Sequence, residues 1–264
     1  MSKADMFLTD FPVRLLVRHP LVRRSLTVHA VRDLSPTLRR VTLTGTDLDG
    51  FTADGPDDHI KVFFAVGEDT AARDFTPRAF RAGRAGVPAA LDLDFALHGT
   101  DAPATGWASR ARVGDGLQIG GPRRSKLLPE GIRSAVLIAD ATALPATARW
   151  LEALPAKVAV TVLIVGNDPA LAEYLAEGER PGTQIQAVDA NSHADALIEL
   201  LNDLVIDDGT LVWAAGEAGS LIPLRRHLRQ HLGLGRDQAQ VSGYWKLGVD
   251  NLDHHAPLDP TDPD

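Results

Sequence analysis

Strands and helices alternate along the second half of the sequence, and this alternation constrains the fold more than any other feature. Residues 135–139 form an unbroken apolar run, Ala-Val-Leu-Ile-Ala, which is typical of a strand buried on both faces. Strands separated by helices form right-handed crossover units, so we predict a doubly wound parallel sheet of the α/β class. The predicted strands are Ala135–Ala139, Val158–Val165, Thr183–Val188 and Thr210–Ala215, and the predicted helices are Ala141–Leu154, Pro169–Ala176, Ala194–Leu204 and Ser220–Leu232.

The first half of the sequence has short strand-like segments and almost no helical periodicity. The clearest segment is Leu91–His98, in which Leu, Leu, Phe and Leu alternate with other residues at a period of two. Glycine, aspartate and proline separate the segments from one another, so we predict a small antiparallel β-barrel. The other strand-like segments are Ser25–Val31, Arg39–Thr44, His59–Val66 and Leu117–Gly120.

These two patterns divide the chain into two domains and a tail. We predict a barrel domain over residues 12–128 and a nucleotide-binding α/β domain over residues 129–250. Residues 251–264 are rich in proline and aspartate, and we expect them to form a mobile tail.

Composition excludes several classes of protein. The sequence has no cysteine, which excludes disulfides, thiolate-bound zinc, iron–sulfur clusters and a cysteine nucleophile. The formal net charge of -8 does not attract nucleic acid or an anionic membrane in bulk, although a local basic patch can still bind an anion. The apolar stretch near the N-terminus is too short to span a membrane and is followed by no small-residue cleavage site, so we expect a cytoplasmic protein without membrane insertion.

Two turns that follow predicted parallel strands are candidate dinucleotide sites. The first begins at Asp140, and Thr142 within it can cap the helix that follows. A helix that starts at the carboxyl end of a parallel strand offers its N–H groups to a phosphate, although a turn of this kind is more often an ordinary helix cap. The second turn, Gly216-Glu217, contains a glycine that lets a ligand approach the backbone.

Two other patterns receive structural interpretations. Residues 114–121 (Gly-Asp-Gly-Leu-Gln-Ile-Gly-Gly) are similar to a glycine-rich dinucleotide loop, but they lie between strand-like segments and open no helix. We therefore interpret them as a turn of the barrel. His227 and His231 lie four residues apart on a predicted helix, but no third metal ligand is evident. We predict a solvated polar face there and no metal site.

The segment Arg73-Asp74-Phe75-Thr76-Pro77-Arg78 combines groups that suit a flavin nucleotide. Arg73 and Arg78 supply forked donors for phosphate. The Phe75 ring can cover one face of a flavin, and the Thr76 hydroxyl can hydrogen-bond a ring nitrogen. Without the rest of the chain, a solvated arginine-rich loop is the better interpretation.

The rest of the chain changes that interpretation, because it resembles the siderophore-interacting proteins, a branch of the ferredoxin–NADP reductase superfamily. The family pattern Arg-x-Tyr-Thr-x-Arg is followed by His-Gly-x-x-Gly-Pro-Ala-Ser-x-Trp-Ala, and the match is collinear from about Leu26 to Gly248. The matching segments are Arg73–Arg78, His98–Ala108, Gly114-Asp115, Gly121-Pro122, Asp140–Pro145, Gly216-Glu217 and Gly243–Gly248. The chain departs from the pattern at Phe75, Ala102 and Thr105, where the family has tyrosine, glycine and serine.

The resemblance implies roles for individual residues. FAD would be held by Arg73, Phe75, Thr76 and Arg78 and, on its pyrophosphate side, by a loop with His98, Gly99, Thr105, Trp107 and Ala108. NADH or NADPH would be received by Asp140, Thr142, Ala143, Gly216 and Glu217. Tyr244 and Trp245 would lie near the flavin face, where with Thr76 they form the predicted catalytic set. Lys61 and Lys246 would receive the anionic ferric siderophore, although a pair of solvated lysines is a serious alternative.

The implied activity is an FAD-dependent transfer of electrons from reduced nicotinamide to ferric iron in a siderophore, with release of ferrous iron. Two alternatives stay open: a general NAD(P)H:flavin or quinone-type reductase, and a non-catalytic protein that binds ferric siderophores. Whether a protein partner supplies the electrons is also open. Between the two nicotinamides we favour NADH, because Gly166-Asn167-Asp168-Pro169 carries an acid and no basic residue for the extra phosphate of NADPH.

Overall fold

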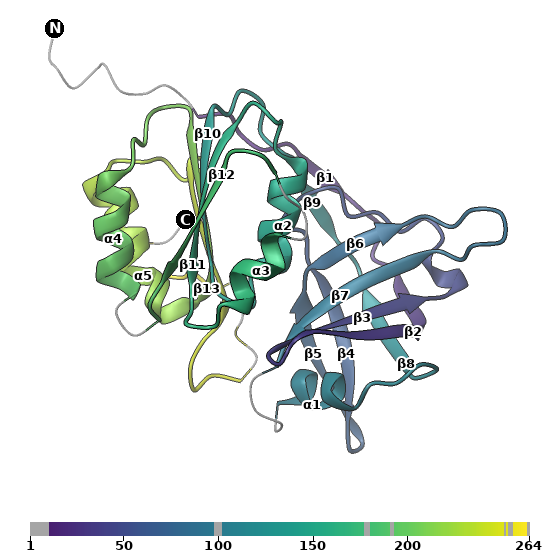
Figure 1. The fold of residues 1–264 in the computed structure, drawn as a ribbon. Coiled ribbons are helices and arrows are strands. Elements are labelled where there is room, and N and C mark those ends of the chain that lie inside the picture. Colours follow the sequence, from purple (N-terminus) through teal and green to yellow (C-terminus); the bar gives the residue numbers. More distant parts are fainter. Residues whose placement is uncertain are drawn as a thin grey trace, which may run out of the picture.

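A computed structural model describes residues 11–97, 102–176, 180–190, 193–250, 252 and 256–262. Two sheets lie side by side, one antiparallel and curled, the other parallel with helices on both faces (Figure 1). The predicted fold class, a β-barrel followed by a doubly wound α/β domain, is confirmed.

The first domain is a seven-stranded antiparallel sheet with the order β5-β4-β8-β2-β3-β7-β6. Side chains such as Val41, Leu43, Leu91 and Leu93 point inward and are completely buried, because alternate positions of these strands face the interior. The strands are β2 (Arg23–Ser35), β3 (Leu38–Thr44), β4 (Ile60–Val66), β5 (Asp69–Phe75), β6 (Pro77–Arg81), β7 (Ala90–Ala96) and β8 (Gly116–Gly120). A short 3-10 helix η2 (Thr46–Leu48) and helix α1 (Pro103–Arg110) lie outside the sheet.

This curled sheet stays open at one place. Strands β5 and β6 are the two edges of the sheet, yet only Thr76 separates them along the chain. Residues 73–78, which the sequence indicates as a flavin site, therefore lie at the opening between the two edge strands of the barrel. A separate two-stranded ribbon, β1 (Leu16–Arg18) with β9 (Arg124–Lys126), lies beside the barrel.

The second domain is a five-stranded parallel sheet with the order β12-β11-β10-β13-β14. Its strands are β10 (Ser134–Ala139), β11 (Ala159–Val165), β12 (Thr183–Val188), β13 (Thr210–Glu217) and β14 (Ala239–Trp245). Its helices are α2 (Leu144–Ala153), α3 (Ala170–Ala176), α4 (His193–Asp203) and α5 (Ala218–Arg226), which continues into the π-helix η3 (His227–His231). Helices α2 and α3 cover the face toward the barrel, and α4 and α5 cover the other face (Figure 1).

Several elements differ from the sequence prediction. The segment 102–110 contains a helix instead of a loop, and the arginine-rich segment 73–78 belongs to two strands. Helix α2 begins three residues later than predicted, and the predicted helix over 220–232 divides into α5 and η3. Strands β1, β5, β6, β9 and β14 were not predicted, because their exposed or charged residues obscure the apolar alternation that identifies a strand. Residues 114–115 do form the predicted barrel turn before β8.

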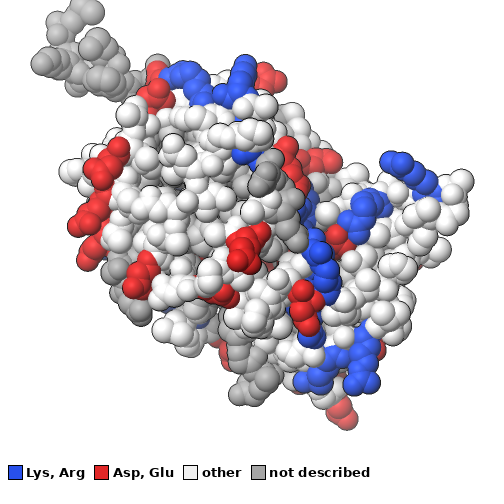
Figure 2. All heavy atoms as spheres, viewed as in Figure 1, with Lys and Arg blue, Asp and Glu red and all other residues white. Residues whose placement is uncertain are grey.

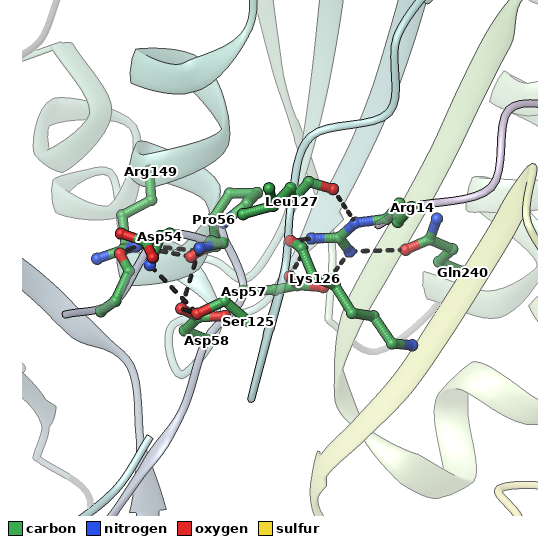
Figure 3. Close-up of polar contacts among 12 residues, drawn as sticks. Arg14, Asp54, Pro56, Asp57, Asp58, Ser125, Lys126, Leu127, Arg149 and Gln240 are labelled. Carbon is green, nitrogen blue, oxygen red and sulfur yellow. Dashed lines mark hydrogen bonds and ion pairs between the residues drawn. The ribbon is translucent and has the colours of Figure 1, made fainter. Parts of the chain in front are cut away.

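Two arginines, the buried Arg14 and the half-buried Arg149, join the domains (Figure 3). Arg149 on α2 donates hydrogen bonds to the carbonyl oxygens of Ala53, Gly55, Pro56 and Pro77, at 2.5 to 3.2 Å. All four carbonyls belong to the first domain, so this one side chain satisfies acceptors that the contact between the domains would otherwise leave buried and unpaired.

Arg14 makes the second junction. It forms a bidentate ion pair with Asp57, at 2.6 and 2.7 Å, and donates to the Gln240 side chain on β14 at 2.9 Å. Its guanidinium also lies 4.8 Å from the centre of the Trp150 ring on α2. Apolar contacts complete the interface, since Phe11 and Leu38 belong to the same buried cluster as α2 and α3.

The end of the chain also has a defined place. Arg226 on α5 forms two hydrogen bonds with Asp259, whose side chain is buried, and Leu258 packs against the core on that side of the sheet. For residues 256–262, the expected mobile tail is therefore replaced by a docked segment.

The Arg149 contacts predict a large loss of stability in Arg149→Met. This change keeps the length of the side chain but leaves four carbonyl oxygens without their donor, so we expect the free energy of unfolding to fall by about 3 kcal/mol. The measurement is urea-induced unfolding followed by circular dichroism.

Arg133→Met is the matched control for that experiment. Arg133 is 60% exposed and pairs only with the surface residues Asp207 and Asp208, so its loss should cost less than about 1 kcal/mol. Equal effects of the two variants would contradict a special role for Arg149.

Candidate functional site

The opening of the barrel meets the end of strand β14. Thr76, between β5 and β6, is only 7% exposed, and its side chain lies close enough to the hydroxyl of Tyr244 to influence the pKa of that phenol. Burial and the nearby Asp57 carboxylate raise the pKa of Tyr244 well above its ordinary value, so the phenol stays protonated. This contact brings two of the predicted catalytic residues together across the domain boundary.

Arg78 is a half-buried cation with one buried N–H group that has no hydrogen-bond partner. Its side chain is 14% exposed, and Nη2 donates to Glu152 on α2 at 2.7 Å. Burial lowers the pKa of Arg78, but the interactions with Tyr174, Glu152 and Asp94 outweigh burial and raise it overall. The Nε–H is buried without a hydrogen-bond partner. Because buried donors are rarely left unpaired, this atom fits a site that is completed by an anionic ligand.

The other residues of this segment have different surroundings. Arg73, on β5, donates to the backbone oxygen of Ala72 at 2.9 Å. Phe75 packs against Phe95, with 4.6 Å between ring centres, and the same aromatic cluster includes Phe64 and Trp107. The Phe75 ring thus contributes to the end of the barrel core.

Helix α1 lies next to this cluster. It begins with Pro103 and no side chain caps its N-terminus, so the first turn can donate to a phosphate. Thr105 and Ala108 are buried at its base, and Trp107 points into the aromatic cluster. The predicted residues His98 and Gly99 lie outside the described part of the chain.

A second group of predicted residues meets at the carboxyl edge of the parallel sheet. The Trp245 indole donates to Asp140 Oδ2 at 2.7 Å, which links the ends of β14 and β10. At Gly216 a side chain would come within 2.6 Å of the same carboxylate, and the backbone φ of +151° also favours glycine. Glu217 receives hydrogen bonds from the backbone of Ser220 and Leu247, at 2.6 and 3.1 Å, and so fixes the chain after Trp245.

The geometry of this edge corrects the expected role of Thr142. Asp140 Oδ1 accepts hydrogen bonds from the backbone and the hydroxyl of Thr142, at 2.8 and 2.6 Å. Thr142 therefore donates to Asp140 and does not cap α2, whose N-cap residue is the fully buried Ala143. An acid already occupies the turn, so a dinucleotide phosphate would meet a carboxylate there.

The two predicted substrate lysines differ in their environment. Lys61 on β4 lies opposite Asp74 on β5, and its ammonium is 2.6 Å from that carboxylate. Lys246 is exposed and forms no ion pair within the described part of the chain. Lys246 is thus the less neutralised of the two cations.

Two residues beside the site are not predicted from the sequence. Asp57 lies close enough to Tyr244 to raise its pKa, and Arg14 holds Asp57 in place. Burial raises the pKa of Asp57, but the Arg14 hydrogen bonds outweigh burial and hold it below its ordinary value. The sequence offers one signal, an arginine that interrupts the apolar run from Phe11 to Val17.

The histidine pair shows no metal geometry within the described residues. His227 and His231 stack with 4.9 Å between ring centres, and His227 contacts the Asn202 side chain at 3.1 Å. No group of three potential metal ligands occurs in the part of the chain that the structure describes. Over the same residues, none of the helices has the length and apolarity that a membrane span requires.

Comparisons with known proteins assign both domains to one family. Residues 132–248 match the siderophore-interacting protein family, and residues 27–72 and 67–126 match its FAD-binding domain. Ferric vibriobactin reductase ViuB of Vibrio cholerae is 30% identical over 84% of this chain and 89% of its own. The NADPH-dependent ferric-chelate reductase of Escherichia coli is 30% identical over 87% of this chain and 95% of its own.

A solved structure agrees with these matches. A siderophore utilization protein from T. fusca superimposes with a TM-score of 0.79 at 35% identity, and covers 92% of this chain and all of its own. A curled FAD-binding sheet joined to a parallel nucleotide-binding sheet defines a flavoprotein reductase of the ferredoxin–NADP reductase type. Within that class, the chain belongs to the siderophore-interacting protein family, and its cofactors are FAD and a nicotinamide dinucleotide.

The unpaired donor of Arg78 predicts a strong effect on flavin binding. Arg78→Ala removes a buried cation from the predicted phosphate site, so we expect FAD affinity to fall at least about tenfold, as the loss of one charged hydrogen bond implies. Flavin affinity is measured by the recovery of FAD fluorescence on dilution.

Glu152→Gln is the control for that variant, because it removes the charge of the partner of Arg78 and leaves the arginine in place. Its FAD affinity should stay within about threefold of that of the wild-type protein. A folded Arg78→Ala protein that retains flavin as the wild type does would remove Arg78 from the site.

Proposed function

We propose that this protein is a cytoplasmic, FAD-dependent reductase that passes electrons from NAD(P)H to ferric iron held in a siderophore, with release of ferrous iron. The observation that carries the proposal is the proximity of Thr76 to Tyr244, which places the open edge of the flavin domain beside the end of the nucleotide domain. Relatives over nearly the whole chain are named ferric vibriobactin reductase and ferric-chelate reductase.

The residues at the barrel opening suit the parts of FAD. We assign the phosphates to Arg73, Arg78 and the N-terminus of α1, which supply cations and backbone donors. We assign the flavin ring to the space beside Thr76, which lies next to Tyr244 at the boundary of the two domains. FAD held by these residues would supply the redox chemistry that links two-electron oxidation of a reduced nicotinamide to one-electron reduction of ferric iron.

The carboxyl edge of the parallel sheet suits the nicotinamide end of the dinucleotide better than a phosphate. Asp140 holds the Trp245 indole, and Tyr244 next to it reaches the flavin domain. The two aromatic rings border the route by which a planar nicotinamide ring reaches the flavin. They orient the ring and exclude water, and no side chain needs to transfer a proton in this reaction.

Lys61 and Lys246 are proposed to bind the ferric siderophore. Ferric complexes of catecholates and hydroxycarboxylates carry negative charge. Ammonium groups attract such complexes locally, although the net charge of the whole chain is -8. Because Asp74 neutralises Lys61 in part, Lys246 carries most of this attraction.

One spectroscopic experiment tests the proposed activity. The purified protein should be yellow, lose its flavin absorbance with anaerobic NAD(P)H, and regain it when a ferric siderophore is added. Protein that folds but binds no flavin would point to a non-catalytic binding protein. Reoxidation by free flavin or ferricyanide, but not by any ferric siderophore, would point to a general reductase.

Asp168 predicts a preference for NADH. It accepts hydrogen bonds from Thr37 and from the backbone of Ala170, which lower its pKa and keep it ionised after strand β11. A carboxylate there repels the extra phosphate of NADPH. We expect Asp168→Asn to raise the efficiency of flavin reduction by NADPH about two- to fivefold, as an exposed charge contributes on the order of 0.5 to 1 kcal/mol.

The control is Asp208→Asn. Asp208 precedes β13, at the amino ends of the parallel strands, whereas Asp168 follows β11 at their carboxyl ends. The control should leave the ratio of NADH to NADPH efficiency unchanged. One relative is named NADPH-dependent, so the opposite preference is a real alternative. If the wild-type protein prefers NADPH in stopped-flow reduction, Asp168 does not contact the ribose of the dinucleotide.

The unequal environments of the lysines predict opposite effects of two substitutions on ferric-siderophore affinity. Lys246→Ala should weaken it about tenfold, whereas Asp74→Asn should strengthen it by freeing the charge of Lys61. Both affinities are measured by quenching of tryptophan fluorescence, at low and high ionic strength, because salt screens exposed charges. Lys157→Ala, an exposed lysine before β11, is the control, and equal affinities throughout would place the substrate elsewhere.

A further inference from the structure

Exposed apolar side chains concentrate near the start of the described chain. Among the described residues, five of the large hydrophobic side chains that are exposed to solvent occur within ten positions of one another. They are Val13, Leu15, Leu16, Leu21 and Val22, with exposed fractions between 40% and 72%. Scattered apolar residues on a surface are ordinary, but a concentration of this kind marks an interaction site.

Exposed cations lie on the same ribbon and next to it in the chain, with Lys126 opposite Leu16 and Arg124 opposite Arg18. We call the whole group the β1 surface, and its cations are Arg18, Arg23, Arg123, Arg124 and Lys126. None of the five forms an ion pair within the described residues, and the sequence has no acid from Phe11 to Arg32. On the loop that contacts β9, Asp57 is paired with Arg14, Asp58 is buried and accepts from Ser125, and Asp54 is exposed.

The β1 surface is a firmly held part of the fold. Strand β1 pairs with β9 along its whole length, and backbone hydrogen bonds join Leu15 to Leu127 and His19 to Arg123. Arg14, which lies in the same segment, pairs with Asp57 and so attaches the start of β1 to the rest of the domain (Figure 3). These hydrogen bonds hold the backbone of the segment in place. The apolar side chains therefore face solvent as part of the folded structure.

Charge is distributed unevenly over the rest of the molecule. On the face shown in Figure 2, acidic side chains gather over α4 and cations lie along the seam between the domains and on the barrel. A chain with a net charge of -8 would be repelled by an anionic surface unless it turned a basic region toward it. The β1 surface is such a region.

We propose that the β1 surface is a peripheral docking site for an anionic phospholipid bilayer. Arginine and lysine pair with lipid phosphates, while Val and Leu side chains between them enter the headgroup region. Nucleic acid would use the cations but not the aliphatic side chains. A second copy of the chain docked symmetrically would place these cations against one another. The inference does not rest on the proposed reductase activity.

Flotation with lipid vesicles tests the proposal on the full-length protein. It should float with vesicles of phosphatidylglycerol and phosphatidylcholine in equal parts, should not float with phosphatidylcholine alone, and should bind less as salt is raised. Leu15→Ser with Leu21→Ser, and separately Arg123→Glu with Arg124→Glu, should each lower the partition coefficient about tenfold. All four side chains are exposed, so the variants should fold, which circular dichroism checks.

Two controls match these variants in chemistry and exposure. Val113→Ser removes an apolar side chain of the barrel that is 69% exposed. Lys157→Glu reverses the charge of an exposed lysine that precedes β11 in the parallel sheet. Both should bind anionic vesicles as the wild type does. Equal binding by wild type and β1-surface variants, or no binding at all, overturns the proposal. So does a dimer in sedimentation equilibrium that the same variants dissociate, because the surface would then join two copies of the chain.

Discussion

The arrangement of the two domains depends on two arginines at their boundary. Arg149 satisfies four backbone carbonyls of the first domain from a helix of the second, and Arg14 pairs with Asp57 while it contacts Gln240 and Trp150. Buried guanidinium groups tolerate little displacement, because each lost hydrogen bond leaves a buried polar atom unpaired. The relative orientation of the sheets is therefore fixed by hydrogen-bond geometry as well as by apolar packing.

That orientation creates the candidate site. The barrel sheet has two free edges, and the chain passes from one to the other through Thr76 alone. The parallel sheet presents the ends of β10, β13 and β14 toward this opening, where Asp140, Gly216 and Trp245 meet. Neither domain contains the site by itself, since the Thr76–Tyr244 contact needs one residue from each. A rigid boundary is what keeps a flavin and a nicotinamide at a constant separation, as hydride transfer requires.

Much of the candidate site could be found from the sequence, because its residues occur in distinctive short motifs. Arg73–Arg78, Asp140, Gly216 and Trp245 all lie in such motifs, and the structure brings Asp140, Gly216 and Trp245 together at the carboxyl edge of the parallel sheet. Their pairings could not be read in the same way. Thr142 is expected to cap a helix but donates to Asp140, and Lys61 is expected to receive an anionic substrate but also pairs with Asp74. A motif specifies residue types, whereas a pairing depends on which strands become neighbours.

The sequence by itself determined the fold class, because unbroken apolar strands that alternate with helices have one common solution, a doubly wound parallel sheet. It also determined that thiol chemistry is absent, because there is no cysteine. Only the tertiary structure decided that the last strand is β14, that the tail packs on α5, and that Asp57 stands beside Tyr244. These features arise from contacts between residues far apart in the chain, and local periodicity carries no record of them. Arg14 and Gln240 are separated by 226 positions, and their hydrogen bond exists only because the whole fold brings them together.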